Sequence, residues 1–353
     1  MPPLPLLPQI PNPNSKIPNS LPPSPNPGRL CYPLTLKESD LAKADLHVHT
    51  RYSAWRHMRF IHPRDCYLEP TEAYARALGA GMDWVAVTDH DSVEGALRLL
   101  QMPGVDPAKV IVGEELECSF PETGQWVHVN VLGLDESQHG ELHRLKDDVR
   151  DVVGYCRNRG LLHILNHPFQ SYFGQKPLRA YIEDILALFT HVEGLNGGVA
   201  SLQNRAVRAL CAAAGAQGWD LTQVGGSDAH TAGRIGKAWT EAEGVTALEF
   251  MDSVRAGRCH PGGTSQGVWG LFLSVERVIG TYYARLYSGR GGGGGAAAYS
   301  GDLLAATACL PAAFGPFPLA VVALNQARQK AVSRSVLNML SSLDWDAMAW
   351  ATR

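Results

Sequence analysis

Between residues 42 and 265, the chain alternates short apolar runs with segments whose apolar positions recur at helical spacing. The run AKADLHVH is typical of a β-strand, and PTEAYARALGAG after it has a proline in its first turn and glycines at its end, as helices do. Further apolar runs predict strands at residues 82–88, 110–119, 127–134, 161–167, 192–196 and 221–230, and a long helix at about residues 138–157. About seven βα-like units of this kind indicate an α/β fold.

Side chains that bind metals occur at the predicted strands. His47 and His49 close the first strand, and because side chains alternate along a strand, both imidazoles point to the same face. Alone, this pair also fits a solvated strand face. In a barrel of parallel strands the carboxyl ends meet at one face, where metal-binding residue types from distant strands would converge. The candidates at the other strands are Asp89, His90, Glu114, Glu115, His128, His167, Asp228 and His230.

Composition limits which binding partners and which cellular compartment we expect for the protein. The 353 residues are 45% hydrophobic, enough for a large core, and the formal net charge of -3 gives no broad basic surface. We therefore do not expect stable binding of nucleic-acid duplexes. The seven cysteines are odd in number and contain no C-x-x-C pair, which favours reduced thiols and a cytoplasmic location over a disulfide framework.

Both ends of the chain differ from its middle. Residues 1–40 are predicted to be a disordered Pro-rich tail without the pattern of a signal peptide. Residues 266–353 are predicted to be a helical appendage interrupted by a Gly-rich linker at about residues 289–298. Residues 303–324 carry no charge, but three prolines and a glycine argue against a membrane-spanning helix there. A membrane is therefore not an expected partner.

Six short motifs between residues 43 and 265 resemble those of one known family in type and order. They are DLHVHTRYS, TDHDSVEG, GEELE, VHVNVLGLD, NHP and GSDAH. Together they look like the PHP family, named for polymerase and histidinol phosphatase. The resemblance implies a distorted (β/α)7 barrel that holds two or three divalent ions (Mn, Zn or Fe) at its C-terminal face and hydrolyses phosphate esters.

The resemblance also implies which residues hold the ions. It places His47, His49 and Asp228 on a first ion, with Glu114 bridging to a second ion at His90. The remaining histidines are expected at a third or substrate-side ion: His128, His167 and His230.

Catalytic roles and one exclusion follow from the same assignment. Alternation along the strand turns Glu115 away from its neighbour Glu114, so Glu115 is not expected among the ligands. The residues expected to act in catalysis are His90, Glu114, Asp228 and His230.

One position departs from the family pattern. Many members continue Y-S-D-G after the first motif and use that aspartate for the second ion, whereas this chain has Ala54 there. The loop that follows contains His57, His62, Asp65 and Glu69, and we expect Asp65 to take the missing role. The alternative is that Asp65 caps the helix that begins after it.

The expected reaction is metal-dependent cleavage of a phosphate ester, since bound ions activate water and withdraw charge from phosphoryl oxygens. The substrate would be a small phosphorylated metabolite, a nucleotide or a short oligonucleotide. Two alternatives stay open, namely a non-catalytic PHP module that uses metal for folding or partner binding, and hydrolysis of an amide on the same ions. Cationic side chains expected to hold the substrate phosphate are Arg51, Arg56, Arg234 and Lys237.

Overall fold

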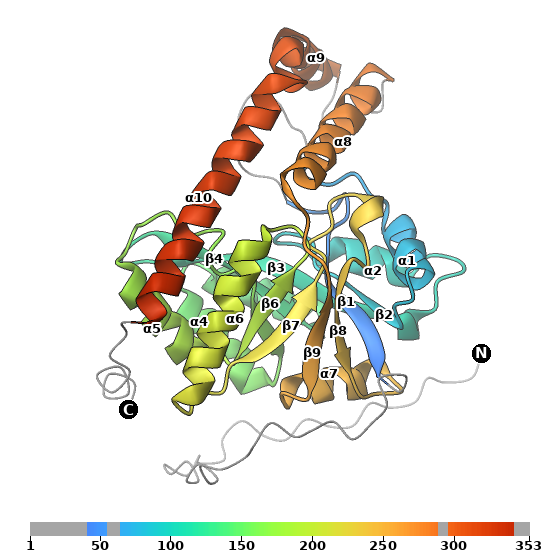
Figure 1. Ribbon diagram of the computed structural model, residues 1–353. Helices are drawn as coiled ribbons and strands as arrows, with labels where there is room; N and C mark the ends of the chain where they lie inside the picture. Colours follow the sequence, from blue (N-terminus) through green and yellow to red (C-terminus); the bar gives the residue numbers. More distant parts are fainter. Residues whose placement is uncertain (1–40, 55–63, 289–295, 342–353) are drawn as a thin grey trace, which may run out of the picture. The chain divides into compact units, whose positions relative to one another are not determined.

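The computed structural model describes residues 41–54, 64–288 and 296–341. The strands in these ranges form one mixed sheet in the spatial order β7-β6-β5-β4-β3-β2-β1-β8-β9 (Figure 1). They are β1 (Ala42–Val48), β2 (Trp84–Val87), β3 (Val110–Phe120), β4 (Gln125–Leu132), β5 (Leu162–Leu165), β6 (His191–Asn196), β7 (Thr222–Gly226), β8 (Ala238–Ala242) and β9 (Cys259–Gly263).

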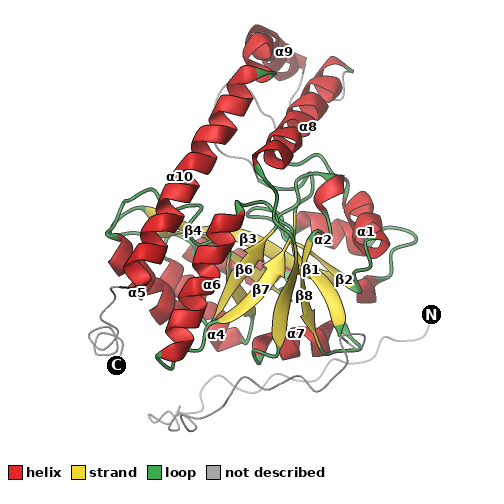
Figure 2. Ribbon diagram, in the orientation of Figure 1, coloured by secondary structure: helices red, strands yellow, loops and turns green. Residues whose placement is uncertain are grey.

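Helices surround this sheet (Figure 2). Those that follow strands up to β8 are α1 (Pro70–Gly79), α2 (Glu94–Leu100), α3 (Glu136–Leu145), α4 (Val149–Arg159), α5 (Leu178–Leu188), α6 (Ser201–Ala216) and α7 (Ala247–Arg255). The described residues also include two short 3-10 helices in loops, η2 (Pro107–Lys109) and η3 (Ala232–Arg234). In the same ranges, three helices follow the last strand: α8 (Val268–Tyr287), α9 (Ala296–Ala313) and α10 (Pro316–Leu340).

The prediction of a distorted α/β barrel is confirmed, and the structure adds strands that run against the others. β1, β2 and β3 are parallel neighbours, as are β5, β6 and β7. β4 runs antiparallel to both β3 and β5, because only a few residues separate β3 from β4 and so short a connection permits only a hairpin. β8 and β9 extend the sheet beyond β1 as further antiparallel strands.

The two ends of the sheet come together and nearly close the barrel. The hydroxyl of Thr240 on β8 donates to the carbonyl oxygen of Gly225 on β7 at 2.9 Å and accepts from its backbone N–H at 2.8 Å. A β-carbon on Gly225 would lie 2.2 Å from the carbonyl oxygen of Trp239, so only glycine fits at this contact. An isolated bridge between Val48 and Ala229 also joins the end of β1 to the loop after β7.

Apolar faces explain how the helices attach. In α1, the buried residues Ala73, Tyr74 and Ala77 recur at helical spacing and pack with Val48 and Val85 of the sheet. The long helix predicted at residues 138–157 is instead two helices, α3 and α4. The break occurs where the side chain of Asp148 accepts a hydrogen bond from the backbone N–H of Arg150 and caps α4.

The C-terminal helices contact the barrel through defined groups. Val336 of α10 is fully buried in the largest apolar cluster, and the guanidinium of Arg328 donates to the carbonyl oxygens of Tyr172 and Gln170, each at 2.8 Å. α9 begins at Ala296, inside the predicted Gly-rich linker. The rest of that linker up to residue 295 and the predicted tail, residues 1–40, lie outside the described residues.

Among the helices of the described residues, none alone is long and apolar enough to cross a bilayer. The length and composition of a membrane span are reached only when two helices are taken together, Leu303–Ala313 and Pro316–Leu340. These two helices are bent by 71° relative to each other.

Candidate metal centre

The carboxylate of Glu115 lies at the middle of a group of histidines. Its Oε2 is 3.2 Å from Nε2 of His47, 3.3 Å from Nε2 of His49 and 3.0 Å from Nδ1 of His90. Its Oε1 is 3.1 Å from Nδ1 of His128. Glu115 is fully buried, so imidazoles rather than water surround it.

A fifth imidazole and an amide complete this shell on the side of β5. Nε2 of His167 lies 3.1 Å from Oε1 of Glu115, and the side-chain amide of Asn166 donates to the same oxygen at 2.8 Å. Both residues follow β5 directly. Side chains from four strands and their C-terminal loops therefore meet at one carboxylate.

His47 and His49 lie at the end of β1, where the pairing of this strand with β2 is irregular. The register with β2 shifts between Asp45 and Val48. Val48 packs outward with apolar residues of α1, while His47 and His49 are buried at Glu115. The carboxylate of Asp45 accepts hydrogen bonds from the backbone N–H groups of Ser227 and Gly236, both at 2.8 Å, and so holds the loop after β7 beside the histidines.

That loop and β6 add two further carboxylates. Oδ1 of Asp228 lies 3.4 Å from Nε2 of His49 and 3.7 Å from Nε2 of His47. Oε1 of Glu193, on β6, is 2.9 Å from Nδ1 of His47, and its Oε2 accepts a hydrogen bond from the backbone N–H of His167 at 3.0 Å. Asp228 and His167 both have positive φ, 50° and 23°, which is a costly backbone conformation that surrounding contacts must hold.

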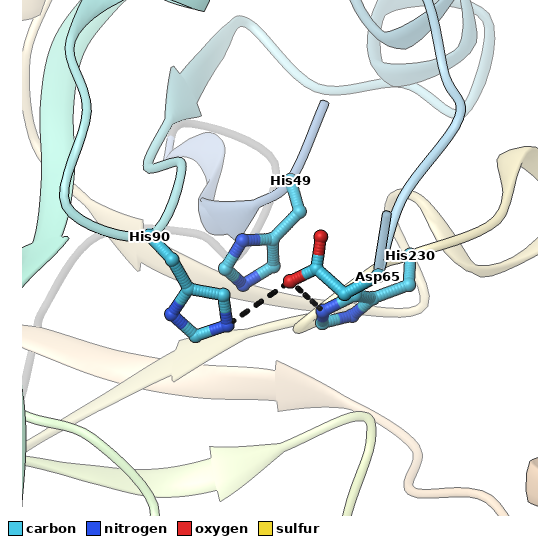
Figure 3. A group of neighbouring side chains, drawn as sticks. All are labelled: His49, Asp65, His90 and His230. Carbon is cyan, nitrogen blue, oxygen red and sulfur yellow. Dashed lines mark ion pairs between the residues drawn. The ribbon is translucent and has the colours of Figure 1, made fainter. Parts of the chain in front are cut away.

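Asp65 enters the site from the long loop after β1, as Figure 3 shows. Its Oδ2 lies 3.4 Å from Nε2 of His90 and 3.5 Å from Nε2 of His230. The alternative role as a helix cap is excluded, because Glu69 occupies the N-cap position of α1 and no side chain caps that end. The structure thus places Asp65 where the residue missing at Ala54 was expected to act, and the backbone N–H of Ala54 donates to the carbonyl oxygen of His90 at 2.9 Å.

The prediction for Glu114 is wrong and is corrected by the structure. Glu114 points to the opposite side of β3, where its Oε2 lies 2.8 Å from Nδ1 of His139, and Glu115 occupies the position expected for it. Alternation does send the two side chains to opposite faces of β3, but Glu115, not Glu114, is the one that faces the site. Glu114 shares its face with the buried Leu116 and Cys118, whereas Glu115 shares its face with polar Glu117, and this pattern could have identified it.

The electrostatics of the site follow from this packing. Burial raises the pKa of Glu115, but the imidazoles of His47, His128 and His90 overcome that effect and hold it well below its usual range. Burial also raises the pKa of Asp65, yet His230 and His90 bring it down to about 2. Glu115 and Asp65 are therefore ionised, and they in turn contribute to raising the pKa values of His47, His128 and His230.

The donor atoms fit divalent metal ions. Both oxygens of Asp65 and Oε2 of Glu115 are buried and accept no hydrogen bond, although imidazole nitrogens lie 3.0–3.5 Å from Oδ2 of Asp65 and Oε2 of Glu115. Nitrogen and carboxylate oxygen donors of this kind are the ligands of Zn, Mn and Fe. Four groups at this centre have ligand atoms within 4.8 Å of one another: His49, Asp65, His90 and His230; His47, His49 and Asp228; His90, Glu115 and His128; and His47, His167 and Glu193.

The residues predicted to hold phosphate are dispersed. Arg51 lies near the centre, with Nη1 2.9 Å from Oε1 of Glu69. Arg234 is half-buried and donates to the carbonyl oxygen of Gly197 at 2.9 Å, and Lys237 is exposed just before β8. Arg56, like the loop residues His57 and His62, lies outside the described residues.

A pocket of about 920 Å³ opens beside His230. Arg51, Glu69 and η3 line it from the barrel, and α8 lines it with Arg277 and Arg285. Nη2 of Arg285 lies 3.3 Å from the same oxygen of Glu69 that binds Arg51. Sequence reasoning missed Arg277 and Arg285, because nothing in the local pattern of α8 indicates what it packs against.

Parts of this chain are similar to known proteins. A family model described as PHP-associated matches residues 211–259. An uncharacterized protein of Methanocaldococcus jannaschii is 31% identical over 133 residues, which are 36% of this chain and 68% of that protein. An error-prone DNA polymerase of Cutibacterium acnes is 28% identical over 130 residues, which are 35% of this chain but 11% of the polymerase.

Solved structures give matches of lower identity. A protein of Bifidobacterium adolescentis, described as a candidate metal-dependent phosphoesterase, has a TM-score of 0.41 and 15% sequence identity. The superposition covers 61% of this chain and 96% of that one.

Proposed function

Because this chain belongs to the PHP domain family, we propose that it is a metal-dependent hydrolase that cleaves a phosphate ester. The observation that supports this most is the buried carboxylate of Glu115, which three imidazoles face at 3.0–3.3 Å without forming hydrogen bonds to Oε2. Two or three divalent ions (Mn, Zn or Fe) would occupy the groups of ligands around it. When bound, such ions activate water near neutral pH and withdraw charge from phosphoryl oxygens.

The residues of the metal centre would have different roles according to their positions. Glu115 would hold ions together with His47, His49 and Asp228 on one side and with His90, Asp65 and His230 on the other. Glu193 would orient the ring of His47 through Nδ1, and the remaining ligands would be His128 and His167. Because His230 borders the pocket, it would meet the substrate before the other residues of the centre. It would either hold an ion or, if it holds none, donate the proton that the leaving oxygen needs.

The pocket beside His230 favours an anionic substrate. Arg51 and Arg285 share one carboxylate, Glu69, and Arg277 brings a third guanidinium from α8. A phosphate group entering this pocket would meet three guanidinium groups, whose charge the two lining carboxylates, Glu69 and Glu72, only partly neutralise. A pocket of about 920 Å³ suits a small phosphorylated metabolite, a nucleotide or the end of a short oligonucleotide.

We also propose that the protein is located in the cytoplasm. The described cysteines Cys66, Cys118, Cys156, Cys211, Cys259 and Cys309 are all free thiols, as expected in a reducing compartment.

The test is hydrolysis of phosphate esters by the full chain loaded with Mn, Zn or Fe. Chromogenic phosphomonoesters and phosphodiesters serve as first substrates, and Glu115→Gln removes the central charge while keeping the shape of the side chain. We expect this variant to lose at least ~100-fold in turnover. Glu241→Gln is the matched control, because Glu241 pairs with Lys43 and His260 away from the centre.

The same experiment separates the enzyme from a non-catalytic module. A module that uses metal only for folding would bind ions, lose stability when they are removed, and hydrolyse none of the esters at any metal loading. Turnover that is equal in the wild-type chain and in Glu115→Gln would reject the proposed centre.

A further inference from the structure

Glu114, His139 and His143 form a second cluster on the other face of β3. Oε2 of Glu114 lies 2.8 Å from Nδ1 of His139 and 3.3 Å from Nε2 of His143. The two histidines are four residues apart on α3, so their rings lie one above the other, with centroids 4.2 Å apart. Ligand atoms of all three side chains lie within 4.8 Å of one another.

An ordinary ion pair explains this arrangement poorly. Glu114 is fully buried on the face of β3 that carries Leu116, Cys118 and Phe120, where an ionised carboxylate is costly without compensation. Both imidazoles approach the same oxygen, Oε2, while Oε1 is buried and accepts no hydrogen bond. A carboxylate placed only to pair with two histidines would give one oxygen to each.

We propose that these three side chains bind one divalent transition metal ion, Zn²⁺ being the best fit to two imidazoles and one carboxylate. The buried carboxylate supplies the anionic ligand from the strand, and the two histidines supply nitrogen ligands from one helix face. The side chains of His139 and His143 are 23% and 24% exposed, so an ion there has a route to solvent and a free coordination position.

This site is separate from the centre at Glu115. Glu114 and Glu115 are neighbours on β3, and alternation sends their side chains to opposite faces of the sheet. None of the four ligand groups of the centre includes Glu114, His139 or His143. Loss of the second site should therefore leave the ligands of the first in place.

Metal content of the full chain tests the proposal. The protein is stripped with a chelator, equilibrated with Zn²⁺ or Co²⁺ alone, freed of unbound metal and analysed for metal per chain. We expect His139→Ala and His143→Ala each to lower the content by one equivalent and to leave hydrolysis at the other centre within about twofold of wild type. His260→Ala is the matched control, because this imidazole faces a single carboxylate, Glu241, and should bind no ion.

A second measurement keeps the test decisive if a variant folds poorly or if the proposed function is wrong. In a chain carrying Glu115→Gln, Zn²⁺ should still raise the melting temperature, and adding His143→Gln should abolish that rise. Equal metal content in wild type, His139→Ala and His143→Ala would overturn the second site. Loss of all bound metal in Glu115→Gln alone would also overturn it, whether or not the chain hydrolyses phosphate esters.

Discussion

The carboxylate of Glu193 lies 2.9 Å from Nδ1 of His47, while the opposite nitrogen of that ring faces Glu115 at 3.2 Å. Glu193 therefore fixes the orientation of the imidazole and makes Nε2 a better ligand. We expect Glu193→Gln to weaken metal binding by ~10 to 100-fold without unfolding the protein. Titration with a competing chelator measures this, and an unchanged affinity would show that β1 alone orients His47.

Asp65→Ala should lower turnover by at least ~100-fold, because it removes the only carboxylate oxygen that lies near both His90 and His230 in the described residues. Stability of the metal-free protein should not fall through loss of a helix cap, since Asp65 caps no helix. Adding Ala54→Asp should restore part of the activity, because the backbone of residue 54 adjoins His90. Full activity of Asp65→Ala would remove this residue from the site.

Arg277→Ala should raise KM for a phosphate ester by ~10-fold and change kcat by less than ~3-fold, which is the signature of lost ground-state binding. The reason is that Arg277 lines the pocket beside His230. Arg208→Ala, an exposed position on α6, is the control for removing one positive charge. Steady-state kinetics of both variants give KM and kcat. A fall in kcat at constant KM in Arg277→Ala would contradict a role of Arg277 in substrate binding.

The metal-free protein should lose stability as the pH rises from about 6.5 to about 10. Burial lowers the pKa of His230, but Asp65 and Asp228 overcome that effect and raise it to about 9. Burial likewise lowers the pKa of His128, and Glu115 raises it to about 10. A raised histidine pKa stabilises the fold fully below its unfolded value, and this stabilisation is lost as the pH rises through the folded value.

Melting temperatures of the chelator-treated protein across this range check that prediction, and His230→Gln should flatten the slope. Adding metal should have the opposite dependence, because the imidazoles must lose protons to bind it. Proton release on metal addition in weakly buffered solution is the direct measurement. A melting temperature that climbs with pH in the metal-free protein would contradict the assigned pKa directions.

Gly225→Ala should destabilise the protein by about 2 kcal/mol or more, because its β-carbon would press on the backbone of Trp239 where the barrel closes. Gly215→Ala in α6 is the matched control, since nothing lies within 4 Å of its β-carbon and alanine favours a helix by about 0.5–1 kcal/mol. Denaturant unfolding of both variants gives the comparison. Equal stability of the two would show that the contact between β7 and β8 relaxes freely.

Local pattern predicted the elements that carry the site better than it predicted their directions. His47, His49, His90 and Asp228 could be found because each closes a strand, and a strand end is visible in the sequence. His128 lies within β4 rather than after it, since β4 runs against its neighbours, and strand direction depends on pairing partners far along the chain.

The carboxylates were harder to predict than the histidines. Asp65 was found because a departure at Ala54 called for a replacement, but the choice between Glu114 and Glu115 required knowing which face of β3 looks inward. Glu193 sits in a short buried strand without a motif, and only the folded structure brings it to His47. Sequence therefore identifies ligands in motifs and misses those that depend on packing.

The positive φ angles of His167 and Asp228 have a consequence for directed evolution. Each such angle costs the fold of the order of 1–3 kcal/mol, and asparagine or glycine would adopt it more easily than the present residues. A library selected only for heat resistance should thus accumulate Asp228→Asn and His167→Asn, and with them lose metal. Selection for stability and selection for chemistry pull these two positions in opposite directions, so a thermostable variant should be screened for metal content before it is used.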